Sequence, residues 1–324
     1  MRGAANRRAS QRCAVLLMGP TGSGKSALAI RLAEQLPLEI ISVDSALVYR
    51  GMDIGTAKPN AQLRGRIPHH LIDIRDPAAA YSAGEFTRDA HLAMQDIWRR
   101  GRQPLLVGGT MLYFHALSAG IAPLPQADPA QRAAIDSQAA QVGWPAVHKE
   151  LAKVDPEAAA RIHVNDPQRI QRALEVYRLT GNTITKLQQE RVSVFSDVKV
   201  MEFAIAPLER AELHTNIERR FKAMLEEGLV AEVKNLYERG DLSAEHPSMR
   251  AVGYRQVWRY LAGQCALAEA TEQAIAATRQ LAKRQLTWLR RRLDAQWLDS
   301  MHPEVARVIF DALSKGGFAT RSSV

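Results

Sequence analysis

The stretch Gly19-Pro-Thr-Gly-Ser-Gly-Lys-Ser26 decides the fold, because it matches the phosphate-loop pattern G-x-x-x-x-G-K-[ST]. An apolar, strand-like run at residues 14–18 precedes it, and a stripe of Leu28, Leu32 and Leu36 predicts a helix over residues 26–36. In such a loop, backbone N–H groups surround phosphate oxygens and the following helix points its positive N-terminus at the same anion. We expect the whole loop to bind a diphosphate: Gly19, Pro20, Thr21, Gly22, Ser23, Gly24, Lys25 and Ser26.

Two side chains of this loop carry more specific expectations. Lys25 adds a full positive charge, and the Ser26 hydroxyl is the expected ligand of Mg²⁺, the cofactor that the pattern implies. These atoms require a diphosphate-like group, and a nucleotide is only one molecule that supplies it. The loop by itself therefore leaves the identity of the phosphate compound open.

Further strands are predicted on either side of a helical pattern at residues 83–100. One covers residues 39–43 and ends at Asp44, and another covers residues 104–107 and ends at Gly108-Gly109-Thr110. Strands that alternate with helices predict a parallel sheet, and ligands bind outside the carboxyl ends of its strands. Gly19, Asp44 and Thr110 each follow a predicted strand, so we expect them to meet at one edge of the sheet.

The character of the chain changes near residue 121, where "IAPLPQADP" has three prolines in nine residues. Residues 129–191 are helical and polar, a strand returns at 198–206, and residues 208–298 again look helical. We predict an α/β fold, with a P-loop parallel-sheet core, helices on both faces and a mainly helical insertion domain. The expected core is discontinuous (13–121 and 198–300), the insertion covers 122–197, and residues 1–12 and 315–324 are expected to be frayed termini.

Composition narrows the class of protein. The 324 residues have no apolar run of membrane-spanning length, and Cys13 and Cys265 form neither a C-x-x-C pair nor a zinc pattern. We therefore expect a reduced, cytoplasmic protein with no membrane partner, and a monomer by default. Lys and Arg outnumber Asp and Glu by 43 to 34, and this charge leaves two interpretations open: a polyanionic partner, nucleic acid first, or a merely basic surface.

Asp44 permits three interpretations from its position alone. It could be a Mg²⁺ ligand, a general base that faces the phosphate site, or an N-cap of the following turn. Asp53 is a second acid in a segment that reads as a loop. The cluster of His69, His70 and Asp73 lacks a distant third ligand, so a structural role is favoured over a metal site.

Basic helical segments dominate the second half. Residues 164–181 begin with Asp-Pro and end with Thr-Gly, and this helix places Arg169 and Arg172 on one face. Residues 279–292, "RQLAKRQLTWLRRR", carry six basic residues and no acid, beside an apolar stripe that we extend to Leu293. "MRAVGYRQ" at residues 249–256 adds a turn suited to base stacking or phosphate contact.

Together these segments resemble the tRNA dimethylallyltransferases, also called tRNA isopentenyltransferases, in their bacterial form. The matching segments run in collinear order over about residues 14–300: GPTGSGKS (19–26), VDSALVYRGMDIGTAKP (43–59), HHLIDI (69–74), VGGTMLY (107–113), DPQRIQRALEV (166–176), AVGYRQ (251–256) and KRQLTWLR (283–290). The second of these is specific to the family rather than to phosphate loops in general.

The resemblance implies a chemistry. In this family the loop holds the diphosphate of dimethylallyl diphosphate, and the dimethylallyl group goes to N6 of adenosine 37 in tRNAs that read codons beginning with U. Asp44 would act as general base, Lys25 would stabilise the departing pyrophosphate, and Thr110 with Thr21 would position the substrates. The target base would be flipped out of the RNA to reach them.

The resemblance also implies contacts with the anticodon stem-loop of tRNA. The residues carried over are Asp44, Ser45, Ala46, Leu47, Thr110, Arg132, Gln168, Arg169, Ile170, Gln171, Arg172, Arg250, Ala251, Val252, Gly253, Tyr254, Arg255, Lys283, Arg284, Gln285, Leu286, Thr287, Trp288, Leu289 and Arg290. Three rival functions share the phosphate loop: a small-molecule or nucleotide kinase, a nucleic-acid-stimulated ATPase, and an adenylate isopentenyltransferase that acts on free AMP. None of the small-molecule rivals needs the insertion or two cationic helices.

Overall fold

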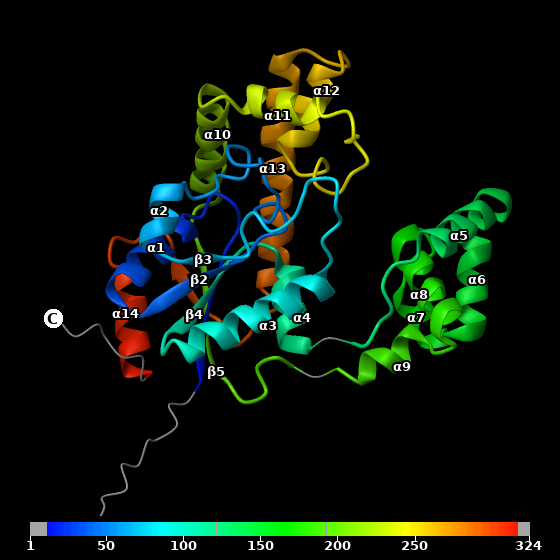
Figure 1. Cartoon of the computed structure of the whole chain (residues 1–324), viewed down its shortest axis with the longest axis horizontal. Helices are drawn as coiled ribbons and strands as arrows, with labels where there is room; N and C mark the ends of the chain where they lie inside the picture. The colour runs from blue at the N-terminus through cyan, green and yellow to red at the C-terminus, as the bar shows by residue number, and fades with distance from the viewer. Residues whose placement is uncertain (1–11, 121, 192, 317–324) are drawn as a thin grey trace, which may run out of the picture. The chain divides into compact units, whose positions relative to one another are not determined.

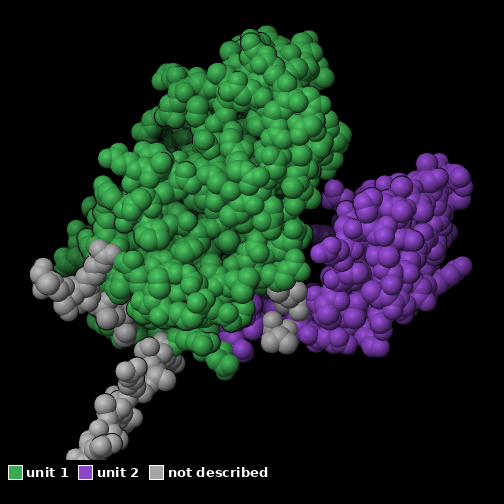
Figure 2. Space-filling view, viewed as in Figure 1, with its two compact units in different colours: residues 1–115, 197–324 green, residues 116–196 purple. Residues whose placement is uncertain are grey.

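The computed structural model describes residues 12–120, 122–191 and 193–316, which form two compact units. Unit 1 comprises residues 1–115 and 197–324, and unit 2 comprises residues 116–196 (Figure 2). The two junctions between the units follow residues 115 and 196, where the sequence analysis expects them after residues 121 and 197. The first junction lies within α4 (Met111–Ala119). Most of both predicted termini, 1–11 and 317–324, lies outside the described residues.

Unit 1 is built on one six-stranded parallel sheet with the order β3-β2-β4-β1-β5-β6 (Figure 1). The strands are β1 (Cys13–Met18), β2 (Leu38–Val43), β3 (His69–His70), β4 (Gln103–Gly108), β5 (Lys199–Ala206) and β6 (Gln296–Asp299). Every residue of β1 and β2 is buried, as expected for parallel strands covered on both faces. The α/β fold class is confirmed.

Helices cover both faces of the sheet. On one face, α1 (Lys25–Gln35) and α14 (Val305–Lys315) share a core with alternate strand residues such as Val15 and Leu17. On the other, α3 (Ala83–Arg99) packs on β2 and β4, and its start is fixed by a capping box between Ser82 and Glu85 (Figure 1). A short α2 (Ala61–Arg66) begins at the side-chain cap of Asn60.

A second cluster of buried apolar side chains lies among four further helices of unit 1, which Figure 1 shows beyond one end of the sheet. Its helices are α10 (Arg210–Glu226), α11 (Leu229–Tyr237), α12 (Tyr254–Leu261) and α13 (Leu267–Leu289). Val48, Tyr49 and Met52 from the loop after β2 are buried in this cluster. The loop that begins at Asp44 is therefore held by packing at its far end.

The same loop is also fixed by a carboxylate. Glu232 of α11 accepts hydrogen bonds from the backbone N–H groups of Asp53, Ile54 and Gly55 at 2.7–3.1 Å. Tyr254 donates its hydroxyl to the same carboxylate at 2.5 Å, and a side chain at Gly55 would meet the Tyr254 ring at 2.5 Å. Asp53 thus belongs to a clasped loop, as its sequence context predicts.

Unit 2 is a bundle of short helices with its own apolar core. The helices are α5 (Pro129–Val142), α6 (Trp144–Val154), α7 (Pro156–Arg161), α8 (Pro167–Thr180) and α9 (Ile184–Gln189). Asp166 caps the start of α8 and Gly181, at φ 68°, ends it, as the Asp-Pro and Thr-Gly signals predict.

Three expectations about the end of the chain are wrong. Residues 208–298 are not all helical, because 296–299 form β6 and pair with β5. The core does not stop at residue 300, because Val305, Ile309 and Leu313 of α14 fill its interior. Leu293 does not extend the apolar stripe, because α13 ends at Leu289 and Leu293 is 91% exposed.

Candidate active site

Three loops that follow neighbouring strands meet at one edge of the sheet. Strands β2, β4 and β1 are adjacent, so the residues after them are brought together. Gly19 donates its N–H to the carbonyl of Gly108 (3.2 Å), and Thr110 donates its N–H to the carbonyl of Val43 (3.3 Å). Ser45 donates its N–H to the Thr110 hydroxyl at 3.2 Å. The predicted meeting of Gly19, Asp44 and Thr110 is therefore present.

Glycines allow the close approach of these loops. A side chain at Gly19 would lie 2.5 Å from the carbonyl oxygen of Ile205, and one at Gly108 would lie 2.0 Å from that of Val43. Gly22 (φ 81°) and Gly24 (φ 79°) adopt the left-handed conformation that favours glycine, and Gly24 precedes the first turn of α1. The loop therefore has the shape that presents backbone N–H groups to an anion.

Lys25 is enclosed beside this loop and donates a hydrogen bond to the carbonyl of Pro20 at 3.2 Å. Burial lowers the pKa of Lys25 to about 8, while the nearby Asp44 carboxylate raises it and the nearby Arg220 guanidinium lowers it further. Lys25 forms no salt bridge with any described residue. A half-buried ammonium without an ion pair is suited to bind an anionic ligand.

Arg220 is a site residue that the sequence analysis missed. It lies on α10, and its pKa is lowered by burial and raised by Asp44, which places its charge at the same site as Lys25 and Asp44. Within the described residues, no carboxylate forms a salt bridge with it. The sequence does hold one indication of this role: Arg220 follows Leu213 and Ile217 at helical spacing, so a cation lies on the apolar stripe of α10.

Asp44 is half-buried directly after β2. Its Oδ1 accepts the N–H of Ala46 at 2.8 Å and the longer contact of the Leu47 N–H at 3.4 Å. The carboxylate therefore caps its own turn with one oxygen, and its other oxygen accepts no hydrogen bond from a described residue. Turn formation and a role as base are compatible on this geometry.

Oxygen donors suited to Mg²⁺ lie at this edge. Ser26 is exposed at the start of α1, and Asp44 supplies a carboxylate beside Lys25. A hydroxyl and a carboxylate are ligands that Mg²⁺ takes together with substrate phosphates and water. Among the described residues no cluster of three or more His, Cys, Asp and Glu side chains could hold a metal ion by itself.

The His69, His70 and Asp73 cluster is engaged in packing. His70 Nε2 lies 2.8 Å from the buried Glu39 carboxylate, and His69 Nδ1 lies 2.7 Å from the carbonyl of Ile67. Asp73 pairs with the buried Lys58 at 2.5 Å. These contacts support the structural interpretation.

The expected RNA contacts of unit 1 divide into exposed and buried groups. Arg250, Arg255, Lys283, Arg284 and Arg290 are exposed, and so are Ser45, Thr287 and Trp288. Ala46, Leu47, Thr110, Ala251, Val252 and Leu286 are half-buried. Tyr254 and Leu289 are 0% exposed and Gly253 is buried, so the expectation that these three residues contact RNA is corrected. The Tyr254 hydroxyl binds Glu232, the carboxylate that fixes residues 53–55, and its ring does not stack on a base.

In unit 2 the expected contacts also divide. Gln168 and Arg169 are exposed on α8, whereas Ile170 is 0% exposed and packs in the core. Arg132 and Arg172 both bind the buried Glu175 carboxylate, at 2.9 and 2.6 Å. Gln171 donates to Asp136 at 2.6 Å. Arg169 pairs only with Asp166 among the described residues, at 3.3 Å, and is 67% exposed. Arg169 and Gln168 are therefore the most accessible of these side chains.

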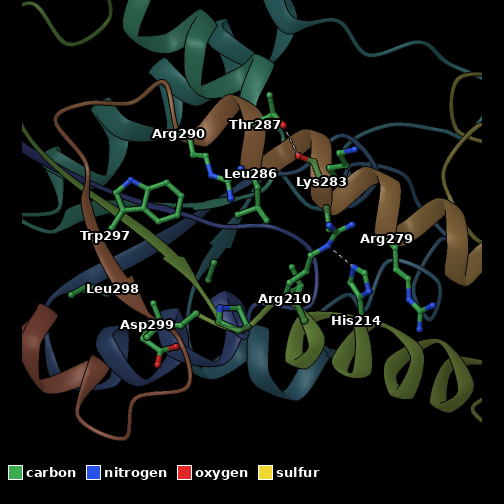
Figure 3. Close-up of a pocket in the computed structure, with 15 residues that line it drawn as sticks. Arg210, His214, Arg279, Lys283, Leu286, Thr287, Arg290, Trp297, Leu298 and Asp299 are labelled. Carbon is green, nitrogen blue, oxygen red and sulfur yellow. Dashed lines mark hydrogen bonds between the residues drawn. The ribbon is translucent and has the colours of Figure 1, made fainter.

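A pocket of about 360 Å³ lies between the start of α10, the C-terminal half of α13 and strand β6 (Figure 3). Arg210, His214, Arg279, Lys283 and Arg290 line it around an apolar floor, and Trp297 closes one side (Figure 3). Among the described residues, no carboxylate forms a salt bridge with Lys283 or Arg290. This face of α13 is therefore strongly cationic.

Comparisons with known proteins agree on one family. The family model described as IPP transferase matches residues 47–292. A tRNA dimethylallyltransferase of Nitrosococcus oceani is 60% identical over 286 residues, which cover 88% of this chain and 91% of that protein. None of the helices in the described residues is both long and apolar enough to span a membrane.

Solved structures are similar over nearly the whole chain. The full-length tRNA isopentenylpyrophosphate transferase of Bacillus halodurans is 37% identical, with a TM-score of 0.68, and the match covers 94% of this chain and 98% of that one. A eukaryotic dimethylallyltransferase acting on tRNA is 26% identical, with a TM-score of 0.80, over 96% of this chain and 81% of that one.

Proposed function

The chain belongs to the IPP transferase family, and from this premise we infer that it is an enzyme that transfers a dimethylallyl group to tRNA. The donor is dimethylallyl diphosphate, and the acceptor is N6 of adenosine 37 in tRNAs that read codons beginning with U. The products are N6-dimethylallyladenosine and pyrophosphate. We propose that the enzyme works as a monomer in the cytoplasm.

One observation carries this proposal: two enclosed cations, Lys25 and Arg220, lie beside the phosphate loop and close to Asp44. The cations and the loop N–H groups would bind the diphosphate and stabilise the negative charge that grows as pyrophosphate leaves. Ser26 would hold Mg²⁺, and the ion would supply further charge neutralisation.

Asp44 is the base that this arrangement provides. As the bond forms between N6 of adenosine and C1 of the dimethylallyl group, the bond between C1 and the diphosphate oxygen breaks. The amine then loses a proton, and the Asp44 carboxylate accepts it. The Thr110 hydroxyl accepts the N–H of Ser45, the residue next to Asp44, and thereby supports the position of the base.

The RNA surface is proposed from the exposed cations. Arg250, Arg255, Arg284 and Arg290 in unit 1 and Arg169 in unit 2 would bind phosphates of the anticodon stem-loop. Arg132 and Arg172 would instead stabilise the fold of unit 2, since both form ion pairs with the Glu175 carboxylate.

Pyrophosphate release tests the function and the missed cation together. With Mg²⁺, dimethylallyl diphosphate and an unmodified anticodon stem-loop, wild-type protein should release pyrophosphate only when the RNA is present. Arg220→Met should lower kcat/KM for the donor at least about 30-fold, since a charged hydrogen-bond partner of the diphosphate is lost. The neighbouring Arg219→Met is the matched control, because Arg219 is exposed and bonds only to Asn216 among the described residues. RNA-independent release, or equal losses in the two variants, would contradict the proposal.

A further inference from the structure

Gln285 of α13 joins the two loops on which the proposed reaction depends. Its Oε1 accepts the N–H of Thr21 at 2.9 Å, and its Nε2 donates to the carbonyl of Gly109, also at 2.9 Å. Thr21 belongs to the phosphate loop after β1, and Gly109 belongs to the loop after β4. One side chain therefore sets the spacing of two loops that lie far from it in the sequence.

The fit at this point leaves no room for another side chain. A Cβ atom at Gly109 would lie 2.5 Å from Gln285 Nε2 and 3.1 Å from the carbonyl oxygen of Gly19. The half-buried amide is thus enclosed between the loops, on a different face of α13 from the residues that line the pocket of Figure 3. Its environment is that of a positioning group rather than a surface contact.

The hydrogen bonds continue from Gly109 to both sides of Asp44. The next residue, Thr110, donates its N–H to the carbonyl of Val43, and its hydroxyl accepts the N–H of Ser45. Val43 and Ser45 flank Asp44 in the chain. A displacement of Gly109 would therefore change the position of the proposed base as well as that of the phosphate loop.

We propose that Gln285 is a positioning residue that fixes the diphosphate site and the proton-accepting site at the correct distance from each other. The inference rests on the proposed function, and it assigns Gln285 a role other than the RNA contact that the family resemblance implies. The amide is suited to the task because it both accepts from Thr21 and donates to Gly109. A carboxylate could accept from Thr21 but would face the Gly109 carbonyl with no proton to donate.

Two substitutions and a matched control test the role. Gln285→Met keeps the length of the side chain without either hydrogen bond, and Gln285→Glu keeps only the acceptor. Gln280→Met changes an exposed glutamine on the same helix. We expect both Gln285 variants to lose about 10- to 100-fold in kcat, because small displacements of reacting groups cost this much. Affinity for the anticodon stem-loop should stay within twofold, and Gln280→Met should behave as wild type.

Further measurements separate positioning from a purely structural role. Calorimetry with inorganic pyrophosphate and Mg²⁺ should show weaker binding to Gln285→Met without any RNA, which tests the phosphate-loop contact even where no transfer occurs. Combined with Thr110→Val, Gln285→Met should cost less than it does alone, because both act through the same loop.

Three results would overturn the inference: wild-type kcat and pyrophosphate affinity in Gln285→Met, a loss that follows RNA affinity alone, or full additivity with Thr110→Val. Failure of the wild-type protein to transfer a dimethylallyl group would instead contradict the proposed function, and the pyrophosphate measurement would still decide the contact to Thr21.

Discussion

Replacement of Asp44 by asparagine separates the proposed base from its structural role. The amide oxygen of the new side chain could still accept the N–H of Ala46, which Asp44 accepts at 2.8 Å, so the turn should survive. What is lost is proton acceptance, which typically contributes about 10²- to 10⁴-fold. At 1.36 kcal/mol per tenfold, that loss is roughly 2.7–5.4 kcal/mol of transition-state stabilisation.

A second, smaller effect of this substitution passes through Lys25. The Asp44 carboxylate raises the pKa of Lys25, which burial has lowered to about 8, so its removal should lower that pKa further. A fall of one unit would reduce the charged fraction of Lys25 at pH 7.5 about threefold. At pH 6.5 Lys25 stays mostly charged in both proteins, so the loss measured there is mainly that of the base.

The assay is kcat/KM for dimethylallyl diphosphate at pH 6.5 and 7.5, with saturating stem-loop RNA. Asp53→Asn is the control, because the Asp53 side chain is 60% exposed and Lys58 also pairs with a second carboxylate, that of Asp73. The kcat/KM of this variant should stay within about twofold of wild type. Asp44→Asn activity within threefold of wild type at both pH values would refute the assignment of the base.

Three other expectations follow from the site and from unit 2. In wild-type protein, kcat/KM for the donor should fall as the pH rises through about 8, because Lys25 is charged only below its lowered pKa. This inflection should be absent in Lys25→Met. The same pH profile in Lys25→Met as in wild type would show that Lys25 does not bind the diphosphate. Glu175→Gln should lower the free energy of unfolding, measured in urea, by roughly 2–3 kcal/mol, since a 0%-exposed carboxylate loses its ion pairs with two partly exposed arginines. The control Glu150→Gln changes a more exposed carboxylate and should lower it by less than about 1 kcal/mol. Equal losses in the two variants would show that the burial of Glu175 does not contribute. Arg169→Gln should weaken stem-loop binding and lower the slope of log Kd against log salt by about 0.7–0.9, and an unchanged slope would place the RNA phosphates elsewhere.

The sequence was informative where local signals are strong. The phosphate loop, β1, β2, β4 and the meeting of Gly19, Asp44 and Thr110 follow from a glycine pattern and from apolar runs of strand length. Parallel strands then place their carboxyl ends at a shared edge, so adjacency in space could be predicted without coordinates.

Features that depend on distant contacts could not be predicted in this way. Arg220 stands next to Arg219, and only the packing of α10 determines which of the two is enclosed. Gln285 lies in a basic run that favours a surface role, yet its partners are far away in the sequence. Tyr254 lies in a segment whose composition suits base stacking, but its side chain is buried and donates a hydrogen bond to the carboxylate of Glu232.

Short elements were also missed for a physical reason. Strand β3 has two residues and β6 has four, so neither presents enough alternation to be distinguished from a loop or a helix end. Both are strands because they pair with β2 and β5, respectively.

Mass spectrometry of the RNA product is the measurement that tests most directly what the phosphate loop holds. Protein, Mg²⁺ and an unmodified stem-loop containing A36, A37 and A38 are incubated with either dimethylallyl diphosphate or ATP, and the RNA is then digested and sequenced by mass. The proposed function predicts one added dimethylallyl group, on A37 alone, and only with the isoprenoid diphosphate. Unmodified RNA together with consumption of ATP would contradict it and would favour a kinase or an ATPase.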